Sequence, residues 1–445
     1  MARRSTPTSS INANLKKDRK STQRERLLAG MTATASRDGY ARANVSAVIA
    51  HAGVSRPTFY DYFTDKDECF LAALIDAQEQ LLIDIEAAVE DQAPQQATQA
   101  AIAALLRFAV SRPTMARLLS TVAMAGGPRA LDARDQGIAD IEQIIERAYR
   151  QLPREDAIPD ISSRMLIGAV QRLLSSRLRR GESGLAGMLD DLIRWINSYE
   201  QPAGEHRWRS MEPAPAPAHS PVLPPLLAPT PLPPGRPRLS REEVAANHRQ
   251  RILFAAVTAF ASKGYAAATI AEITKLAGVD SRAFYRLFRD KEDMFMALHE
   301  LHFQHVMALT ASAFFTGESW PERTWEAART FAQYMEENHT LTRVTFIEGP
   351  AGGPISVQRF DDYLAAFTVF LQEGYRYEPQ GDPPSKLALE AIAATNFEIV
   401  YHQARQSAKP RISGLLPHVT HLTLAPFLGP VAANRFIDEK LRVSY

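Results

Sequence analysis

The sequence contains little that points to catalysis, secretion or a membrane. A single cysteine, Cys69, excludes an intrachain disulfide and suits a reducing compartment. No apolar run approaches the roughly 18 residues needed to span a bilayer, and the early Arg3-Arg4 pair is not followed by the apolar segment of a secretion signal. The G-x-S-x-G, H-E-x-x-H, P-loop and dinucleotide-binding motifs are also missing. We therefore expect a cytoplasmic protein that is not an enzyme and has no cofactor and no membrane partner.

The chain also has little net charge, +1 over 445 residues, but its positive charge is localised. Residues 1–26 hold eight Lys and Arg against two acidic residues, a net charge of 8 − 2 = +6, and residues 236–251 hold five Arg against two Glu, a net charge of 5 − 2 = +3. Local positive charge allows a nearly neutral protein to bind a polyanion. The simpler interpretation, a solvated tail, is weakened because both basic segments precede copies of the same repeat.

The length of the chain favours two domains. Between them, residues 202–237 hold 12 of the 29 prolines. Proline lacks the backbone donor of helices and sheets, so this segment is predicted to be an extended linker that reaches on the order of 100 Å. The sequence "PGRPR" at 234–238 resembles the minor-groove core of an AT-hook, but the basic end of a linker explains it more simply.

Both sides of the linker repeat apolar residues at spacings of three and four, which predicts an all-α protein with two similar halves. Alternating strand patterns are not convincing anywhere in the sequence. The predicted helical segments are 66–92, 95–110, 114–124, 135–151, 161–180 and 185–199 in the first half, and 291–315, 321–338, 355–374, 384–406 and 416–440 in the second.

One segment occurs twice. "AGVSRPTFYDYFTDKDECF" (52–70) and "AGVDSRAFYRLFRDKEDMF" (277–295) belong to an ungapped match, offset by 225 residues, that runs from Arg24/Arg249 to Leu74/His299. In the second copy, an amphipathic helix over 249–263 is followed by Gly264. A short helix then begins with the capping-box pattern of Thr269 and Glu272, and "AGV" supplies a tight turn.

The turn leads into a helix that carries an aromatic pair. Asp280 is predicted to cap this helix, with Phe284 and Phe288 facing inward, and Asp290 to cap the next helix. In the first copy Phe59 and Phe63 form the inward pair, Asn44, Ser55 and Asp65 take the capping positions, Gly53 takes the turn, and Pro57 lies in a first helical turn. Helix, short helix, turn and helix together form a helix-turn-helix.

Through residues 44–70 and 269–295 the chain resembles the tetracycline-repressor (TetR) family of bacterial transcriptional regulators. The resemblance covers about 50 residues per copy. It implies two tandem TetR-like units, each a three-helix DNA-binding domain followed by a helical ligand-binding and dimerisation domain. The expected domains are a basic disordered arm (1–21), the first helix-turn-helix domain (22–70) and its regulatory domain (71–200), the Pro-rich linker (201–240), the second helix-turn-helix domain (241–295) and its regulatory domain (296–445).

The resemblance also suggests which residues contact DNA. Tyr60 and Tyr285 look like the family's phosphate-contacting tyrosine, and Lys66 and Lys291 like its phosphate-binding lysine; a partly buried aromatic and a helix-end charge are the structural alternatives. The copies differ where base edges would be read, which predicts an imperfectly palindromic operator on double-stranded DNA. The predicted DNA-binding residues are Asn44, Ser55, Arg56, Pro57, Thr58, Tyr60 and Lys66, with Thr269, Asp280, Ser281, Arg282, Ala283, Tyr285 and Lys291.

The family implies a repressor that is released by a small apolar effector and that acts as an intramolecular pseudo-dimer or a homodimer. The alternative is an all-α interaction protein in which one or both helix-turn-helix units no longer bind DNA. The first copy departs from the pattern, with Gly30, Thr32, Thr34 and Ala35 in its first helix and Asp61 in place of Arg286. These departures leave two interpretations, a looser first domain or a copy that has lost DNA reading.

Two groups of side chains in the second half suggest a binding site. His299, His302 and His305 are spaced three apart, which favours exposed or pocket-lining histidines over a metal site because no Cys or acidic residue completes a ligand set. An aromatic and methionine group is predicted to be mostly core, with an unidentified subset around an apolar ligand cavity. Its members are Phe314, Phe315, Trp325, Phe331, Tyr334, Met335 and Phe346.

Overall fold

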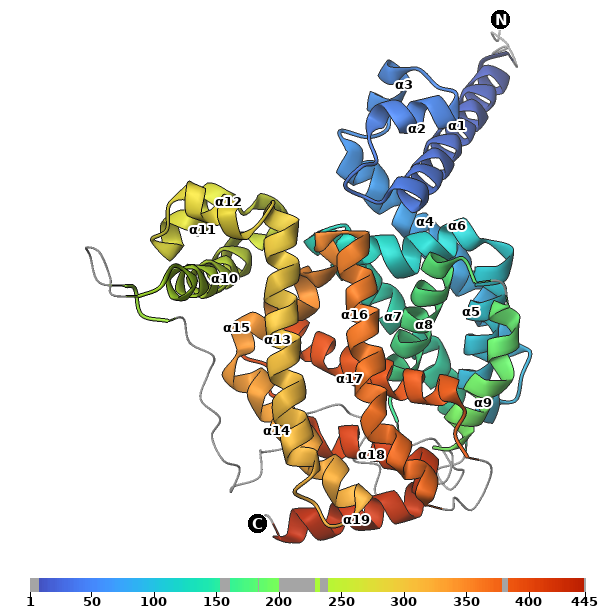
Figure 1. Cartoon of the computed structure of the whole chain (residues 1–445). Coiled ribbons are helices and arrows are strands. Elements are labelled where there is room, and N and C mark those ends of the chain that lie inside the picture. Colours follow the sequence, from blue (N-terminus) through green and yellow to red (C-terminus); the bar gives the residue numbers. More distant parts are fainter. Residues whose placement is uncertain are drawn as a thin grey trace, which may run out of the picture.

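The computed structural model of the protein describes residues 8–152, 161–182, 184–199, 229–232, 239–377 and 383–443, with side chains from residue 22 onward. All regular elements in these segments are helices, which confirms the all-α prediction. Two three-helix heads project from a shared helical body, and the N- and C-termini lie at opposite ends of the molecule (Figure 1). Most of the predicted linker, including "PGRPR", and the side chains of residues 1–21 lie outside the described part.

The first unit begins with a longer helix than the sequence suggested. Residues 8–21, which we expected to be disordered, belong to α1, which spans Thr8–Asp38. The head is completed by α2 (Val45–Ala52) and α3 (Arg56–Tyr60), and the body follows with α4 (Lys66–Glu90), α5 (Ala97–Ser111), α6 (Pro113–Arg117), a π-helical turn (Leu118–Val122), α7 (Pro128–Tyr149), α8 (Ser163–Arg180) and α9 (Leu189–Asn197).

The second unit repeats this order. Its head comprises α10 (Arg241–Ala267), which kinks at Gly264, α11 (Ile270–Ala277) and α12 (Ser281–Leu287). The body contains α13 (Lys291–Phe314), α14 (Trp320–Glu337), α15 (His339–Arg343), a π-helical turn (Val344–Glu348), α16 (Pro354–Phe367), α17 (Lys386–Gln406), α18 (Leu416–Leu428) and α19 (Pro430–Val443). The single helix predicted over 416–440 was wrong, because Gly429 has a φ of +80° and Pro430 follows it.

The predicted helix caps are present in both heads. The side chains of Asn44, Ser55, Asp65, Thr269, Asp280 and Asp290 each accept a hydrogen bond from the backbone N–H three residues later. The capping box at Thr269 is one-sided, since the Glu272 carboxylate lies 2.6 Å from Lys263 Nζ instead. A complete capping box, which the sequence analysis missed, lies at Ser240 and Glu243, where α10 begins.

The two bodies share one hydrophobic core. Helix α8 of the first unit packs along α17 of the second, and buried residues of both units, such as Leu166 and Ile392, belong to the same apolar cluster. Helix α9 also contacts α17, and just beyond its end the Tyr199 hydroxyl donates a hydrogen bond to the Leu422 carbonyl of α18, at 2.8 Å. The heads are therefore carried on a continuous body rather than on two separately packed domains.

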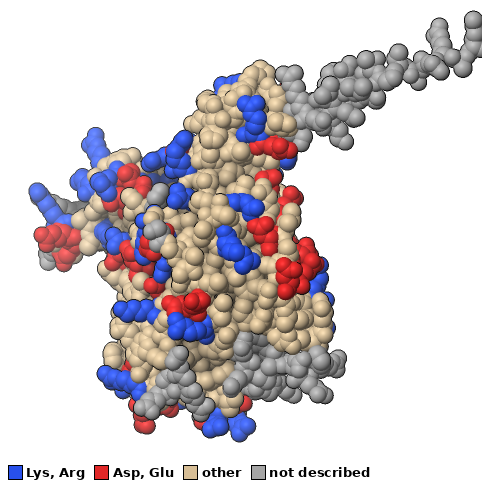
Figure 2. Space-filling model, turned by 90° about the vertical axis from the view of Figure 1, so that its right-hand side faces the viewer, with Lys and Arg blue, Asp and Glu red and all other residues tan. Residues whose placement is uncertain are grey.

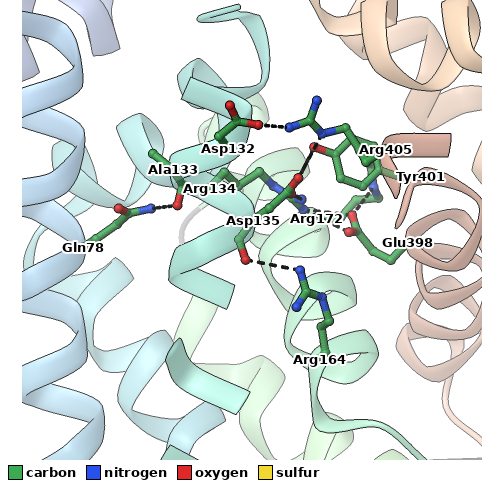
Figure 3. A network of polar contacts seen from close by, with 10 residues as sticks. All are labelled: Gln78, Asp132, Ala133, Arg134, Asp135, Arg164, Arg172, Glu398, Tyr401 and Arg405. Atoms are coloured by element: carbon green, nitrogen blue, oxygen red, sulfur yellow. Dashed lines mark hydrogen bonds and ion pairs between the residues drawn. The ribbon is translucent and has the colours of Figure 1, made fainter. Parts of the chain in front are cut away.

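A buried ionic cluster spans the contact between the units (Figure 3). Arg134 of α7 and Glu398 of α17 lie 3.0 Å apart with side chains that are 5% exposed, and Arg172 of α8 lies 3.5 Å from the same carboxylate. Burial opposes the ionisation of Glu398, but the two guanidinium groups hold its pKa below the ordinary value. Asp135 extends the cluster by accepting hydrogen bonds from Tyr401 (3.1 Å) and Arg405 (3.0 Å).

Candidate nucleic-acid interface and ligand cavity

The third helix of each head separates a buried face from an exposed one. Phe59, Phe63, Phe284 and Phe288 are all buried, as predicted for the inward aromatic pairs. Tyr60 and Tyr285 point away from that core and are 52% and 59% exposed. Arg56 and Arg282 are exposed as well, so each head presents an arginine and a tyrosine on the outer face of its third helix.

The other predicted contact residues around these helices are not equally accessible. Six of them are exposed: Asn44 and Thr269, which cap the second helices, and Ser55, Pro57, Asp280 and Ser281. Thr58 is half-buried, and its hydroxyl lies 2.8 Å from Ser55 Oγ. Ala283 is a correction to the predicted set. It is 1% exposed because it packs into the head core beside Phe284, so its methyl group does not reach a base edge.

The two predicted phosphate-binding lysines already have partners within the protein. Lys66 Nζ donates to the Tyr40 carbonyl at 3.2 Å and lies 4.1 Å from the centre of the Tyr40 ring. Lys291 Nζ donates to the carbonyls of Tyr265 (2.7 Å), Ala266 (3.3 Å) and Ala268 (3.0 Å), and partial burial lowers its pKa. Both ammonium groups thus fasten the loop between the first two helices of their head, and Lys291 does so with all three donors.

Two arginines in each basic segment also stabilise the heads, which the sequence analysis missed. Arg26 and Arg251 donate to the carbonyls of the turn glycines, Gly53 and Gly278, at 3.0 and 3.4 Å. Arg24 and Arg249 lie over the rings of Phe63 and Phe288, at 6.0 and 5.7 Å from the centroids. These arginines recur at equivalent positions of the two repeats. That recurrence was the available signal for a structural role, but it was interpreted only as positive charge.

The first head is closely packed around Gly30, one of the residues from which a looser first domain was predicted. A methyl group added at Gly30 would lie 2.8 Å from the Val48 carbonyl oxygen, too close for a real contact. Gly30 therefore allows α1 to approach the backbone of α2, and Thr32, Thr34 and Ala35 are all buried in the same helix. This packing does not support the interpretation of a looser first domain.

Charge on the rest of the surface is mixed. Figure 2 shows Lys and Arg side chains interspersed with Asp and Glu over one face of the molecule. With a net charge of +1 for the whole chain, a general attraction to DNA is weak. Positive charge on the third helices is local: Arg56 on α3 and Arg282 and Arg286 on α12 are exposed.

The second body holds a partly open apolar cavity of about 160 Å³ between α13, α14, α16, α17 and α18. Of the predicted aromatic and methionine group, Phe331, Met335 and Phe346 line it. Phe314, Trp325 and Tyr334 are buried outside the lining, whereas Phe315 is 73% exposed, so its assignment to the core was wrong. The 27 lining residues include no Lys, Arg, Asp or Glu.

Two of the three histidines contribute polar groups to this cavity. His299 and His302 both line it and are buried, while His305 stands outside it against the Tyr334 ring. His302 Nδ1 lies 3.0 Å from Thr345 Oγ1, but its Nε2 and both ring nitrogens of His299 have no hydrogen-bond partner within the described structure. Burial lowers the pKa of both imidazoles to about 3, so they are neutral at physiological pH.

The corresponding region of the first body is filled. A cavity of about 10 Å³ lies there beside Gln78 and Arg134. Because α4 and α13 begin at equivalent lysines, their positions can be matched: Leu74, Ala77 and Ile85 stand where α13 has His299, His302 and Thr310. All three replacements are buried, so α4 presents an apolar face where α13 lines the cavity.

Comparisons with known proteins agree with this architecture. A family model described as "Bacterial regulatory proteins, tetR family" matches residues 27–73 and 252–298, the two heads. The two heads thus both match the TetR-type domain, which occurs twice in tandem in this chain. No helix in the described segments is long and apolar enough to cross a membrane.

Three individual proteins illustrate the similarity. An uncharacterized HTH-type transcriptional regulator of Bacillus subtilis, YdgC, is 32% identical over 106 residues, which cover 23% of this chain and 54% of that protein. The HTH-type transcriptional activator FasR of Mycolicibacterium smegmatis is 28% identical over 163 residues, covering 37% and 61%. The fatty acid degradation regulator FadR from Bacillus halodurans superposes with a TM-score of 0.36 and 24% identity, over 39% of this chain and 96% of that one. The chain thus spans between half and two thirds of the length of these two curated relatives.

Proposed function

We propose that the protein is a cytoplasmic DNA-binding transcriptional regulator that acts as a single-chain pseudo-dimer. The observation that carries this proposal is the repetition of the exposed Arg and Tyr on the third helix of both heads, over a buried aromatic pair that fixes each helix. The shared core and the Arg134–Glu398 pair hold the two bodies together, as two subunits of a dimer would be held. Two heads on one body would then read two half-sites of one operator.

The half-sites are expected to differ. Arg56 is the first residue of α3, whereas Arg282 is the second residue of α12, where Ser281 takes the first position. This shift of one residue turns the arginine by about 100° around the helix axis. An arginine that contacts guanine from each position would meet a different base step, so the operator would be imperfectly palindromic.

Ligand control would act through the π-helical turn Val344–Glu348. Thr345 and Phe346 of this turn line the cavity. Glu348 of the same turn accepts a hydrogen bond from the Tyr265 backbone N–H at 2.8 Å, next to the Gly264 kink near the end of α10. A molecule that displaces Thr345 or Phe346 would shift this anchor and reposition the second head, and we propose that this releases the DNA and relieves repression.

Selection of bound DNA from a randomised library tests the proposal. Wild type is expected to enrich an asymmetric site, Arg56→Ala to relax one half of it and Arg282→Ala the other, each by about 1–3 kcal/mol at the affected base. Arg150→Ala, an exposed arginine at the end of α7, is the matched control and should leave the motif unchanged. Affinity should also fall steeply as salt is raised to about 200 mM.

Each other result has a distinct meaning. A true palindrome changed by only one of the two variants would mean that two chains pair through one working head, and the single-chain pseudo-dimer would be rejected. No enrichment under any salt condition would reject the regulator altogether and favour an all-α interaction protein.

A further inference from the structure

We infer that the cavity of the second unit binds one small, uncharged, hydroxyl-bearing aromatic molecule per chain, a compound of the phenol class, with its hydroxyl at His299 and His302. A regulatory role for this ligand rests on the proposed function, but its binding does not. The inference depends on four properties of the cavity: its size, its lack of charge, its unpartnered polar groups and its absence from the first unit.

Size limits the ligand to roughly one ring. A dry apolar cavity of about 150 Å³ binds benzene, and the cavity here measures about 160 Å³. Seven phenylalanines contribute to its wall, which offers ring edges and faces to an aromatic guest: Phe303, Phe331, Phe346, Phe360, Phe367, Phe370 and Phe397. A long acyl chain would need several times this volume.

The cavity lining excludes a charged ligand. A carboxylate or an ammonium group would lose its hydration in the cavity without meeting an opposite charge, since none of the lining side chains carries one. The nearby cationic groups are occupied on the other side of the wall: Arg172 stacks 3.4 Å from the centre of the Phe397 ring and faces Glu398. A neutral molecule is therefore favoured over its ionised relatives.

The histidines specify a hydroxyl. A neutral imidazole offers one donor and one acceptor, and both are unpartnered on His299, as is Nε2 of His302. Leaving such groups buried without a hydrogen bond is unfavourable. A hydroxyl group both donates and accepts, so it can satisfy these nitrogens in either tautomeric arrangement, whereas a hydrocarbon satisfies none.

One site per chain follows from the difference between the units. The matching region of the first body holds a cavity of about 10 Å³, and Leu74 and Ala77 replace the two histidines along α4. A homodimer of ordinary units would bind two ligands for two heads. This chain would bind one.

Calorimetry on the full-length chain without DNA tests the inference, with phenol, benzene, benzoate and dodecanoate as probes. We expect phenol to bind with a stoichiometry of one and at least about tenfold more tightly than benzene. Benzoate and dodecanoate should show no saturable binding. Benzoate binding as tight as phenol binding, a stoichiometry of two, or equal affinities for benzene and phenol would each overturn the proposed ligand class.

Variants assign the hydroxyl to its partners. His299→Leu should weaken phenol binding about tenfold and leave benzene binding within about twofold, whereas His305→Leu, on the same helix but outside the cavity, should change neither. Val306→Trp fills the cavity lined by Val306 and should abolish both. Thermal unfolding of each variant verifies that it is folded. If His299→Leu retains full phenol affinity, the assignment to the histidines fails.

The same samples separate this inference from the proposed function. Phenol binding by a chain that selects no DNA would leave the ligand class standing and reject the regulator. Operator binding by a chain that takes up none of the probes would reject the ligand class and leave the regulator standing.

Discussion

The two units share a head but differ inside their bodies. In both heads an arginine donates to the turn glycine, an aromatic pair fills the core and a lysine fastens the first loop. The interiors of the bodies, which lack these backbone contacts, differ between the units. Helix α13 brings His299 and His302 to an apolar cavity, whereas α4 has Leu74 and Ala77 at the same positions. A helix-turn-helix constrains its sequence through backbone contacts, while a body interior needs only to be apolar on average.

The heads also differ in how they are anchored. Glu348 accepts the Tyr265 N–H in the second unit, and Lys291 uses three donors on the adjoining loop. In the first unit the Ser36 hydroxyl donates to the Thr114 carbonyl at 2.8 Å, and Lys66 makes a single hydrogen bond to its loop. In the second unit the anchor Glu348 belongs to the same π-helical turn as Thr345 and Phe346, which line the cavity.

The largest effect is expected where the two units meet. Glu398→Ala leaves Arg134 buried without its carboxylate partner and should lower the free energy of unfolding by about 3–5 kcal/mol. Glu390→Ala removes a carboxylate from a more exposed pair with Arg177 and should cost only about 0–1 kcal/mol. Urea unfolding followed by tryptophan fluorescence measures both. Equal losses in the two variants would show that the ionic cluster does not join the units.

Acid should weaken the fold through buried histidines of the second unit. In the unfolded chain a histidine protonates near pH 6.5, but in the fold the pKa values of His299 and His302 are lowered to about 3 and those of His402 and His418 to about 4. The unfolded state therefore binds more protons between pH 6.5 and pH 3–4, and stability falls as the pH falls through that window. The slope is about 1.4 kcal/mol per pH unit for each fully buried histidine.

Urea unfolding at pH 7.5 and pH 5.5 tests this dependence. The double variant His299→Leu, His302→Leu should flatten the slope by about two protons, because leucine does not titrate. Because Trp195 of the first unit and Trp320 of the second belong to the same core cluster, both are expected to report one transition with this pH dependence. An unchanged slope in the double variant would contradict the burial of neutral imidazoles.

The next largest effect on stability is expected when a residue of one unit is replaced by its counterpart from the other unit. Leu74→His places an imidazole in a filled apolar site and should destabilise the chain by about 2–3 kcal/mol, because it loses packing and buries unpartnered nitrogens. His299→Leu removes such a group from the cavity wall and should be neutral or stabilising. Thermal unfolding of both variants measures the contrast. A larger loss for His299→Leu would mean that the imidazole has a structural partner.

Much of the fold followed from the sequence because the relevant signals are local. The caps at Asn44, Ser55, Thr269 and Asp280 and the inward phenylalanine pairs depend on neighbours within one helical turn, and all of them are confirmed. The break at Gly429 was missed because the apolar pattern continues across it.

The environments of the candidate DNA-binding and cavity residues depend on contacts between distant parts of the chain, which the spacing of residues in the sequence does not determine. Lys66 and Lys291 were matched to phosphate, but their partners are carbonyls 23–26 residues earlier in the chain. Ala283 follows two exposed residues, yet it turns into the core. The cavity is formed by side chains from five helices and the π-helical turn Val344–Glu348, and its histidines could be proposed as pocket-lining only because they recur on one helix. The pairing of Arg134 with Glu398 spans 264 residues and had no local signal.

The smallest predicted effect tests whether the first head is tightly packed or loose. By helix propensity alone, Gly30→Ala should stabilise α1 by about 1 kcal/mol, and Ala255→Gly at the same repeat position should destabilise α10 by a similar amount. The structure predicts that both substitutions destabilise, Gly30→Ala by about 1–3 kcal/mol, since the added methyl group would meet the Val48 carbonyl at 2.8 Å and force α1 and α2 apart. The sign measured for Gly30→Ala by urea unfolding decides the question. A gain in stability would show that α1 and α2 are free to separate, and the first head would then be the looser one after all.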